Sequence, residues 1–279
     1  MATRKQATKT SVRGNPKVAA TGKAAKRVAV KPAASKARVA VTKESAAPDV
    51  RALLMRLELA VPEPRCELSF KTPFQLLIAT ILSAQSTDKM VNAVTPWLFE
   101  KYPTPSALAA APQDDVEELV KRTGFFRNKA KSIRGTAQRL VDQFDGQVPR
   151  SIPTLITLPG VARKTANVVL GTAYGVNEGF VVDTHIARVA QRLRLTQHAE
   201  PGKIEQDLCS AFAQSAWSDT GHRLLLHGRY TCLARAPRCE LCPLNELCGS
   251  RLTAPAESWQ ERAKLEAQRV NEGITVAAS

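Results

Sequence analysis

The segment LPGVARKTANVVL, residues 158–170, places a tight turn directly before an apolar helix. A Pro followed by a Gly is typical of a turn, and the apolar run after it is typical of a buried helix. Backbone N–H groups in such a turn, and at the start of the helix, can bind a phosphate without reading a base. We therefore predict that Gly160, Val161 and Ala162 contact the backbone of a nucleic acid.

Lys164 falls in the first turn of this predicted helix. A lysine amine is almost fully protonated at pH 7, so a nucleophilic lysine needs a lowered pKa or a neighbouring base. Local chemistry leaves two roles open for Lys164, a contact to phosphate and a nucleophile, and it favours the phosphate contact.

A lone carboxylate follows the apolar run Phe180–Val182 and precedes a second amphipathic stretch. Asp183 is well placed to cap the helix that begins after it. An acid held by a helix N-terminus stays ionised, and opposite a lysine amine it could accept a proton or stabilise a developing sugar cation. The sequence leaves both roles open, with capping preferred. His185, two residues later, has no visible metal partner and is interpreted as structural.

Outside these segments, apolar residues recur at spacings of three and four, as they do on the core-facing side of helices. Such stripes occur in Leu53–Leu57, Phe74–Leu82, Ala130–Phe144 and Ile186–Leu193. The strand-like run Phe180–Val182 is too short to carry a sheet. The pattern therefore predicts an all-α globular fold. Its longest apolar stretch is well short of the roughly 20 residues that a membrane-spanning helix needs.

Four cysteines, Cys232, Cys239, Cys242 and Cys248, have the spacing C-x6-C-x2-C-x5-C. Without a secretory signal, such a cluster is more often a metal site than a pair of disulfides. Spacing alone does not separate zinc from an iron–sulfur cluster, because both accept four thiolates. Arg235 and Arg238 lie between the first two cysteines and are predicted to contact phosphate, or else to offset the anionic ligands. The remaining cysteines, at positions 66 and 209, are expected to be small buried side chains.

Charge is concentrated at the start of the chain. The 279 residues carry a net charge of +15, and residues 1–50 hold 12 Lys or Arg against Glu44 and Asp49. This +10 leaves +5 for the rest. Residues 1–49 have no aromatic residue and no sustained period, so we predict a disordered basic tail that binds phosphates nonspecifically. A solubilising extension and a cleavable transit peptide are the alternatives.

The hairpin, the carboxylate and the cysteine loop together resemble the endonuclease III family of helix-hairpin-helix DNA glycosylases and AP lyases. The resemblance covers roughly residues 51–250. It also includes LSAQSTD at residues 82–88 and GFFRNKA at residues 124–130. It implies a six-helix domain at residues 66–177 and a 4Fe-4S cluster domain made of residues 50–65 and 178–250, with double-stranded DNA bound between them. Residues 251–279 are expected to form a mobile C-terminal extension with one charged helix around residues 257–269.

The resemblance also implies a mechanism. Lys164 matches the family's nucleophile and Asp183 its catalytic acid, which reverses the two local preferences given above. The enzyme is expected to remove oxidised pyrimidines from DNA and to nick the strand 3′ to the abasic site by Schiff-base β-elimination. Gln85 is expected to fill the gap left by the flipped base, Phe125 to wedge against the opposite strand, and Lys129 to contact phosphate. A monomer is expected, acting in the cytoplasm at the nucleoid of a bacterium, or in the nucleus or mitochondria of a eukaryote.

Two positions depart from the family pattern. Ala162 stands where a second glycine is usual, and Phe125 stands where leucine is commoner. If position 162 needed a positive φ or a close phosphate approach, the extra methyl group would weaken DNA binding. A catalytically weak DNA-binding or redox-sensing relative therefore stays an alternative. The adenine-excising branch is disfavoured because it lacks the lysine at this position, and a zinc-ribbon module is the alternative without the resemblance.

Overall fold

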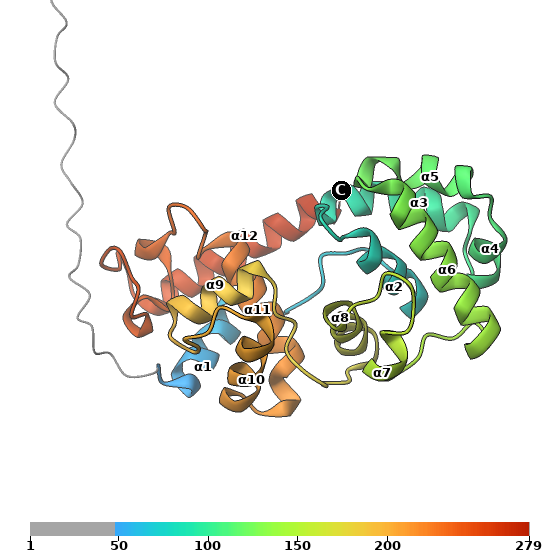
Figure 1. Ribbon diagram of the computed structural model, residues 1–279. Coiled ribbons are helices and arrows are strands. Elements are labelled where there is room, and N and C mark those ends of the chain that lie inside the picture. The colour runs from blue at the N-terminus through green and yellow to red at the C-terminus, as the bar shows by residue number, and fades with distance from the viewer. Residues whose placement is uncertain (1–47, 279) are drawn as a thin grey trace, which may run out of the picture. The chain divides into compact units, whose positions relative to one another are not determined.

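A computed structural model describes residues 48–278. Within this range the chain forms twelve α-helices and four short 3-10 helices and contains no β-strand, which confirms the predicted all-α class (Figure 1). The basic tail predicted for residues 1–49 lies outside the described residues, apart from its last two positions. The α-helices are α1 Val50–Ala60, α2 Pro73–Leu82, α3 Asp88–Lys101, α4 Pro105–Ala110, α5 Gln113–Val120, α6 Phe126–Phe144, α7 Ile152–Leu155, α8 Arg163–Tyr174, α9 Thr184–Arg192, α10 Pro201–Ala211, α11 Trp217–Tyr230 and α12 Trp259–Ala278, and the 3-10 helices are η1 Lys121–Thr123, η2 Gln214–Ala216, η3 Cys239–Leu241 and η4 Asn245–Leu247.

One hydrophobic core is built from residues 68–170 and includes α2 and α8. The hydroxyl of Thr72 caps α2, Pro73 occupies its first turn, and all residues from Leu76 to Leu82 are buried. A helix that is apolar on every side belongs in an interior, and α2 packs against α3, α6 and α8. Its C-terminal end leads directly into the segment that carries Gln85.

The hairpin segment forms a turn with the features of type II. The Val161 N–H donates to the Leu158 carbonyl at 3.2 Å, with Pro159 second in the turn and Gly160 third at φ +77°. The turn lies against α6, where Thr136 donates its hydroxyl hydrogen to the Pro159 carbonyl at 2.7 Å. Only glycine suits position 160, because of both its φ and the proximity of α6.

A second core joins Leu53 and Leu57 of α1 to apolar residues of α9, α10 and α11. Phe180 lies in this core and stacks obliquely on Phe212 and Trp217. The chain thus contributes α1 to the second core, builds the first core, and returns to the second near Phe180. The domain boundaries implied by the resemblance stay predictions.

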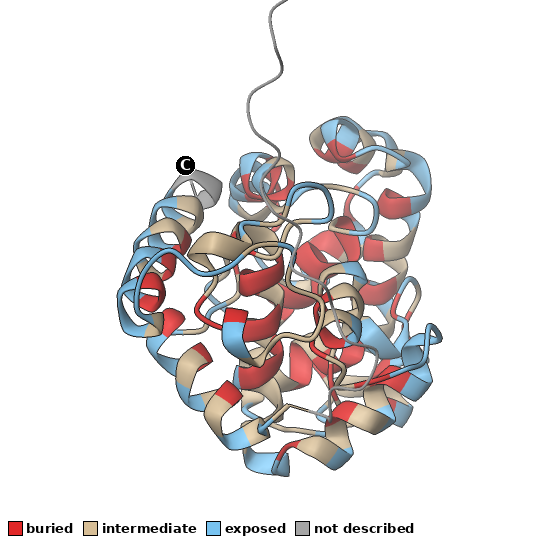
Figure 2. Cartoon of the chain, turned by 90° about the vertical axis from the view of Figure 1, so that its left-hand side faces the viewer, coloured by how far each residue is buried: buried red, intermediate tan, exposed pale blue. Residues whose placement is uncertain are grey.

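The C-terminal extension was expected to be mobile, and the structure corrects that expectation. Residues 259–278 form α12, a continuous helix that packs against α1, α3 and α11. Its buried stripe, visible in Figure 2 as red patches near the C-terminal end, consists of Arg262, Ala263, Glu266 and Val270. Sequence patterning missed this contact because two of the four buried residues are charged.

Candidate functional site

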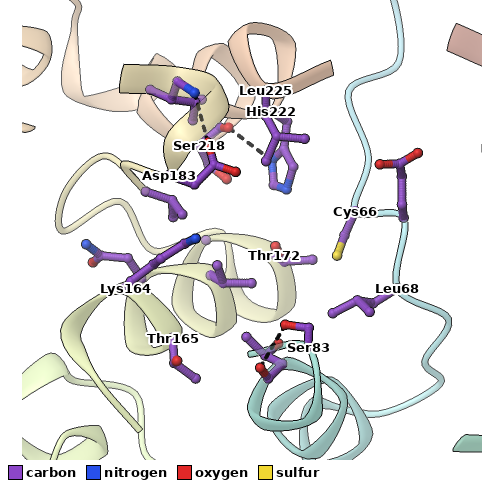
Figure 3. A pocket seen from close by; sticks show the side chains of 18 of the residues that line it. Cys66, Leu68, Ser83, Lys164, Thr165, Thr172, Asp183, Ser218, His222 and Leu225 are labelled. Carbon is purple, nitrogen blue, oxygen red and sulfur yellow. Dashed lines mark hydrogen bonds between the residues drawn. The ribbon is translucent and has the colours of Figure 1, made fainter. Parts of the chain in front are cut away.

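A cavity of about 370 Å³ is lined by residues that belong to both cores or to the loops between them. Figure 3 shows Lys164, Asp183, His222, Ser83 and Cys66 around it. These side chains come from α8, the start of α9, α11, the end of α2 and the loop before α2. The structure therefore brings Lys164 and Asp183, which are 19 positions apart in sequence, to the wall of one cavity.

Lys164 is the second residue of α8, and the type II turn sets the direction in which that helix starts. No side chain of residues 48–278 caps α8. The first N–H groups of a helix have no partner within the helix, so this end offers donors and a positive dipole to an anion. The Lys164 side chain extends into the cavity toward Asp183 (Figure 3).

Asp183 caps α9, as the sequence predicted. Its Oδ1 accepts hydrogen bonds from the N–H groups of His185 at 2.9 Å and of Ile186 at 2.8 Å. Both bonds use the same oxygen, so Oδ2 can face the cavity. Capping and a role at the cavity are thus compatible, because the cap fixes the carboxylate at the wall.

Asp88, at the start of α3, is a further acid at this cavity. Burial raises the pKa of its carboxyl group above the ordinary value, the nearby Asp183 charge adds to the rise, and Lys164 opposes it. Asp88 also pairs with Arg229 of α11 at 2.6 Å, and Arg229 contacts Glu67. The LSAQSTD motif contains Asp88, but its spacing from Arg229 gives no sign that the two residues meet.

Gln85 and Phe125, the two predicted DNA probes, share an unusual backbone. Gln85 has φ +54° and Phe125 has φ +47°, and both side chains are exposed, with Phe125 at 66%. A positive φ costs a non-glycine residue energy, and residues held in this way concentrate at functional sites. The exposure of Phe125 rules out core packing for this side chain. Phe126, by contrast, packs against the first core.

Lys129 does not lie as the sequence predicted. It is 6% exposed, and its ammonium group donates to the Thr123 carbonyl at 2.7 Å. Burial lowers the pKa of Lys129 below its usual value. This ammonium group therefore does not face a phosphate but closes the loop that carries Phe125. The sequence position was misleading because exposed and buried faces of α6 alternate within one turn.

The three hairpin residues have different environments. The Gly160 φ requires glycine, the Val161 N–H is used by the turn and its side chain is buried, and Ala162 is exposed. Ala162 has φ −94° and ψ 169°, an extended conformation that any residue adopts. The departure from glycine at position 162 therefore causes no backbone strain, and Val161 has no amide left for a phosphate.

The four cysteines line a second, smaller cavity together with His227 and Arg192. Although burial raises it, hydrogen bonds from His227 and Arg192 bring the pKa of the Cys232 thiol down to about 7. Burial raises the pKa of the Cys248 thiol to about 11, and the charges of the other three cysteines contribute to the rise. The four sulfurs are thus close enough to affect one another.

Comparisons with known proteins agree with this geometry. Residues 78–214 match the family model of the HhH-GPD superfamily of base excision DNA repair proteins, and residues 232–248 match that of the iron–sulfur binding domain of endonuclease III. Endonuclease III of Synechocystis sp. is 50% identical over 198 residues, which are 71% of this chain and 90% of that protein. Endonuclease III of Escherichia coli is 42% identical over 70% of this chain and 92% of its own length.

The chain belongs to the endonuclease III family. It is a base-excision-repair DNA glycosylase and AP lyase. Among solved structures, a trapped covalent endonuclease III–DNA intermediate aligns with a TM-score of 0.69 at 42% identity, covering 72% of this chain and 94% of that one. A non-covalent endonuclease III–DNA complex aligns with the same TM-score at 43% identity. No helix in residues 48–278 has the length and apolarity needed to cross a bilayer.

The cysteine segment fits the 4Fe-4S cluster of this endonuclease III. Among the described residues, no three His, Cys, Asp or Glu side chains could hold one metal ion. A single zinc would draw four sulfurs to within about 3.8 Å of one another, given Zn–S bonds of about 2.3 Å. The wider cysteine ring suits a cluster of four irons and argues against the zinc alternative. Stoichiometric iron and sulfide in purified protein test this assignment, and stoichiometric zinc without sulfide would overturn it.

The arginines around this segment divide into two groups. Arg235 and Arg238 are exposed, and Arg238 donates to the Tyr230 carbonyl at 3.2 Å. They lie on the cluster segment and not at the wall of the cavity that holds Lys164. Arg192 of α9 instead points at the segment, donating to Cys232 Sγ at 3.2 Å and to the Leu233 carbonyl at 2.7 Å. The sequence gave no sign of this role, because the contact spans 40 residues.

Proposed function

We propose that this endonuclease III removes oxidised pyrimidines from duplex DNA, with Lys164 as the nucleophile and Asp183 as the acid that assists it. The observation that carries the proposal is that both side chains line one cavity, from the starts of two different helices. A helix N-terminus keeps the Asp183 carboxylate ionised, and an ionised carboxylate can stabilise positive charge on the sugar. The solved relative in which a covalent DNA intermediate is trapped supports a covalent route.

The chemistry divides into two stages. The Lys164 amine, having given up a proton, forms a bond to the sugar C1′ while the C1′–N bond to the damaged base breaks, and the base leaves with the electron pair. Ring opening then gives a Schiff base between Lys164 and C1′. Loss of a proton from C2′ breaks the C3′–O bond, and the 3′ phosphate departs, which nicks the strand. Water finally releases the enzyme.

The substrate must be flipped out of the helix to enter the cavity, because its C1′ is otherwise out of reach. Gln85 and Phe125 are exposed at positive φ and suit insertion into the base stack from two sides. The uncapped N-terminus of α8, next to the turn at Gly160, suits a phosphate of the damaged strand. Arg235 and Arg238 would extend the phosphate contact along the cluster segment.

One chain supplies every residue named in this mechanism, so we also propose that the enzyme acts as a monomer. Its place of action would be the DNA of the cell, the nucleoid if the source is bacterial. Ala162 has an ordinary backbone conformation, and this removes the backbone-strain argument that favoured a catalytically weak relative.

Borohydride trapping on duplex DNA with one oxidised pyrimidine tests the proposal. We expect the wild-type protein to form a covalent adduct and to nick the strand, and Lys164→Ala to do neither. Lys164→Arg is the matched control, because it keeps the positive charge but has no amine that forms a Schiff base. It should bind the DNA with near-wild-type affinity and give no adduct.

Two results would overturn the proposal. Base release without trapping by the wild-type protein would exclude the covalent route, and an adduct formed by Lys164→Arg would place the nucleophile elsewhere. If the wild-type protein trapped only on DNA with a preformed abasic site, the assignment of oxidised pyrimidines would be wrong and the lyase assignment would stand.

A further inference from the structure

Two charged residues on the C-terminal helix are completely buried. Arg262 and Glu266 lie one turn apart on α12, and each is 0% exposed. Burying a charge is costly unless it has close partners, so the identity of those partners indicates what the helix is for. Both sets of partners lie in or beside the segment that carries the cluster cysteines.

Arg262 holds the backbone of that segment. Its Nε donates to the Cys242 carbonyl at 2.8 Å, and its guanidinium also pairs with Glu246 at 2.5 Å. Glu246 is further tied to Arg56 of α1. The peptide that follows Cys242 is therefore fixed between α12 and α1.

Glu266 reaches the sulfur side of the same cysteine through a histidine. The His227 Nδ1 donates to the Glu266 carboxylate at 2.7 Å, and both side chains are almost inaccessible to solvent. This bond fixes the orientation of the imidazole ring and directs its Nε2 toward Cys242 Sγ, 3.8 Å away. A carboxylate behind a histidine is a common way to orient the ring at a metal site.

The two contacts converge on one ligand. Arg262 acts on the carbonyl of Cys242, and Glu266, through His227, acts on its sulfur. We propose that α12 is a support for the iron–sulfur cluster, in which Arg262 and Glu266 are positioning residues that keep Cys242 in place as a ligand. The matching iron–sulfur family model ends at residue 248, before α12 begins, so the support is an addition to the part of the chain that binds the cluster.

Two measurable properties follow from such a support. A ligand held at its carbonyl and its sulfur leaves iron less readily, and partners of metal ligands typically change metal affinity 10- to 100-fold when removed. Hydrogen bonds to cluster sulfurs are also among the determinants of the reduction potential. Without the Glu266 carboxylate, the His227 ring is free to turn away from the sulfur, so the potential should fall.

The test uses full-length, cluster-loaded protein. The rate at which visible cluster absorption is lost to an iron chelator measures retention, and film voltammetry measures the potential. We expect Glu266→Leu to lose its cluster about 10-fold faster or more and to have a lower potential. Glu266→Gln keeps the shape and one acceptor oxygen, so it should fall between Glu266→Leu and wild type on both measurements.

Val270→Ala is the matched control, because Val270 lies one turn further on the same buried face and packs in a separate apolar cluster. It should weaken the packing of α12 and leave both cluster measurements at wild-type values. Equal acceleration in Glu266→Leu and Val270→Ala would overturn the proposal, because α12 would then act only through packing. A wild-type potential in Glu266→Leu would also overturn it. Should that variant fail to fold, a wild-type potential and retention rate in both Glu266→Gln and Arg262→Lys would overturn it instead.

Discussion

Exchanging the two small residues of the hairpin, one at a time, gives a strong test of how this fold presents its site. The two variants are Gly160→Ala and Ala162→Gly, which change one methyl group each at positions two residues apart. Gly160 has φ +77° and Ala162 has φ −94°, so the structure predicts different outcomes for the two changes.

The magnitude for Gly160→Ala has two parts. Placing an alanine in the left-handed region costs about 1–2 kcal/mol. The new Cβ would also lie 2.9 Å from Ser132 Cβ and 3.2 Å from Ile81 Cγ2, both in packed helices, and overpacking of this kind costs about 1–3 kcal/mol. The total destabilisation is about 2–5 kcal/mol. Since 1 kcal/mol shifts the Tm by about 2–4 °C at this chain length, the expected drop is about 4–20 °C.

Ala162→Gly removes a methyl group from an exposed, extended residue and relieves no strain. Its main effect is on the unfolded chain, which gains freedom, so the variant should lose about 0.4–1 kcal/mol and about 1–4 °C in Tm. DNA affinity should change by less than about threefold, because less than about 0.7 kcal/mol is involved. Gly160→Ala should bind more weakly, since the turn at Gly160 sets the start of α8.

The assay measures the Tm of cluster-loaded protein and its affinity for duplex DNA with an uncleavable abasic-site analogue. Matched iron content between the variants is the control. If Ala162→Gly raised the Tm, or tightened DNA binding tenfold, position 162 would require glycine and the backbone argument would be wrong. A Gly160→Ala variant as stable as wild type would refute the assignment of the turn.

Three further predictions follow from the probe loop and the tail. Phe125→Ala should reduce single-turnover base release more than DNA affinity, because the exposed ring acts during flipping; an equal loss in both would count against a wedge. Lys129→Met should remove the bond to Thr123, worth about 1.5–3 kcal/mol, and lower the Tm without changing the salt dependence of DNA binding, whereas a flatter dependence would restore Lys129 as a phosphate contact. Deleting residues 1–47, with the α1 cap Asp49 retained, should flatten the salt dependence by about 0.9 per lost phosphate contact; a large fall in the saturated single-turnover rate would contradict this accessory role.

The sequence by itself determined the chemistry of this protein. The segment at residues 158–170, the VDTH motif and the cysteine spacing are local patterns, and each specifies a turn, a cap or a ligand set without reference to the rest of the chain. Helical periodicity predicted the all-α class for the same reason, since a stripe at three- and four-residue spacing needs only one core to face. Capping by Asp183 was likewise readable from its neighbours.

Tertiary structure decided everything that depends on residues far apart in the chain. The pairing of Asp88 with Arg229 joins residues 141 positions apart, and local spacing carries no information on such a contact. Burial decided that Lys129 is a loop clasp and that α12 is packed, because a charged side chain in a sequence suggests solvent until its partner is known. Backbone conformation decided the outcome for Ala162, whose cost depends on the sign of φ and not on its identity.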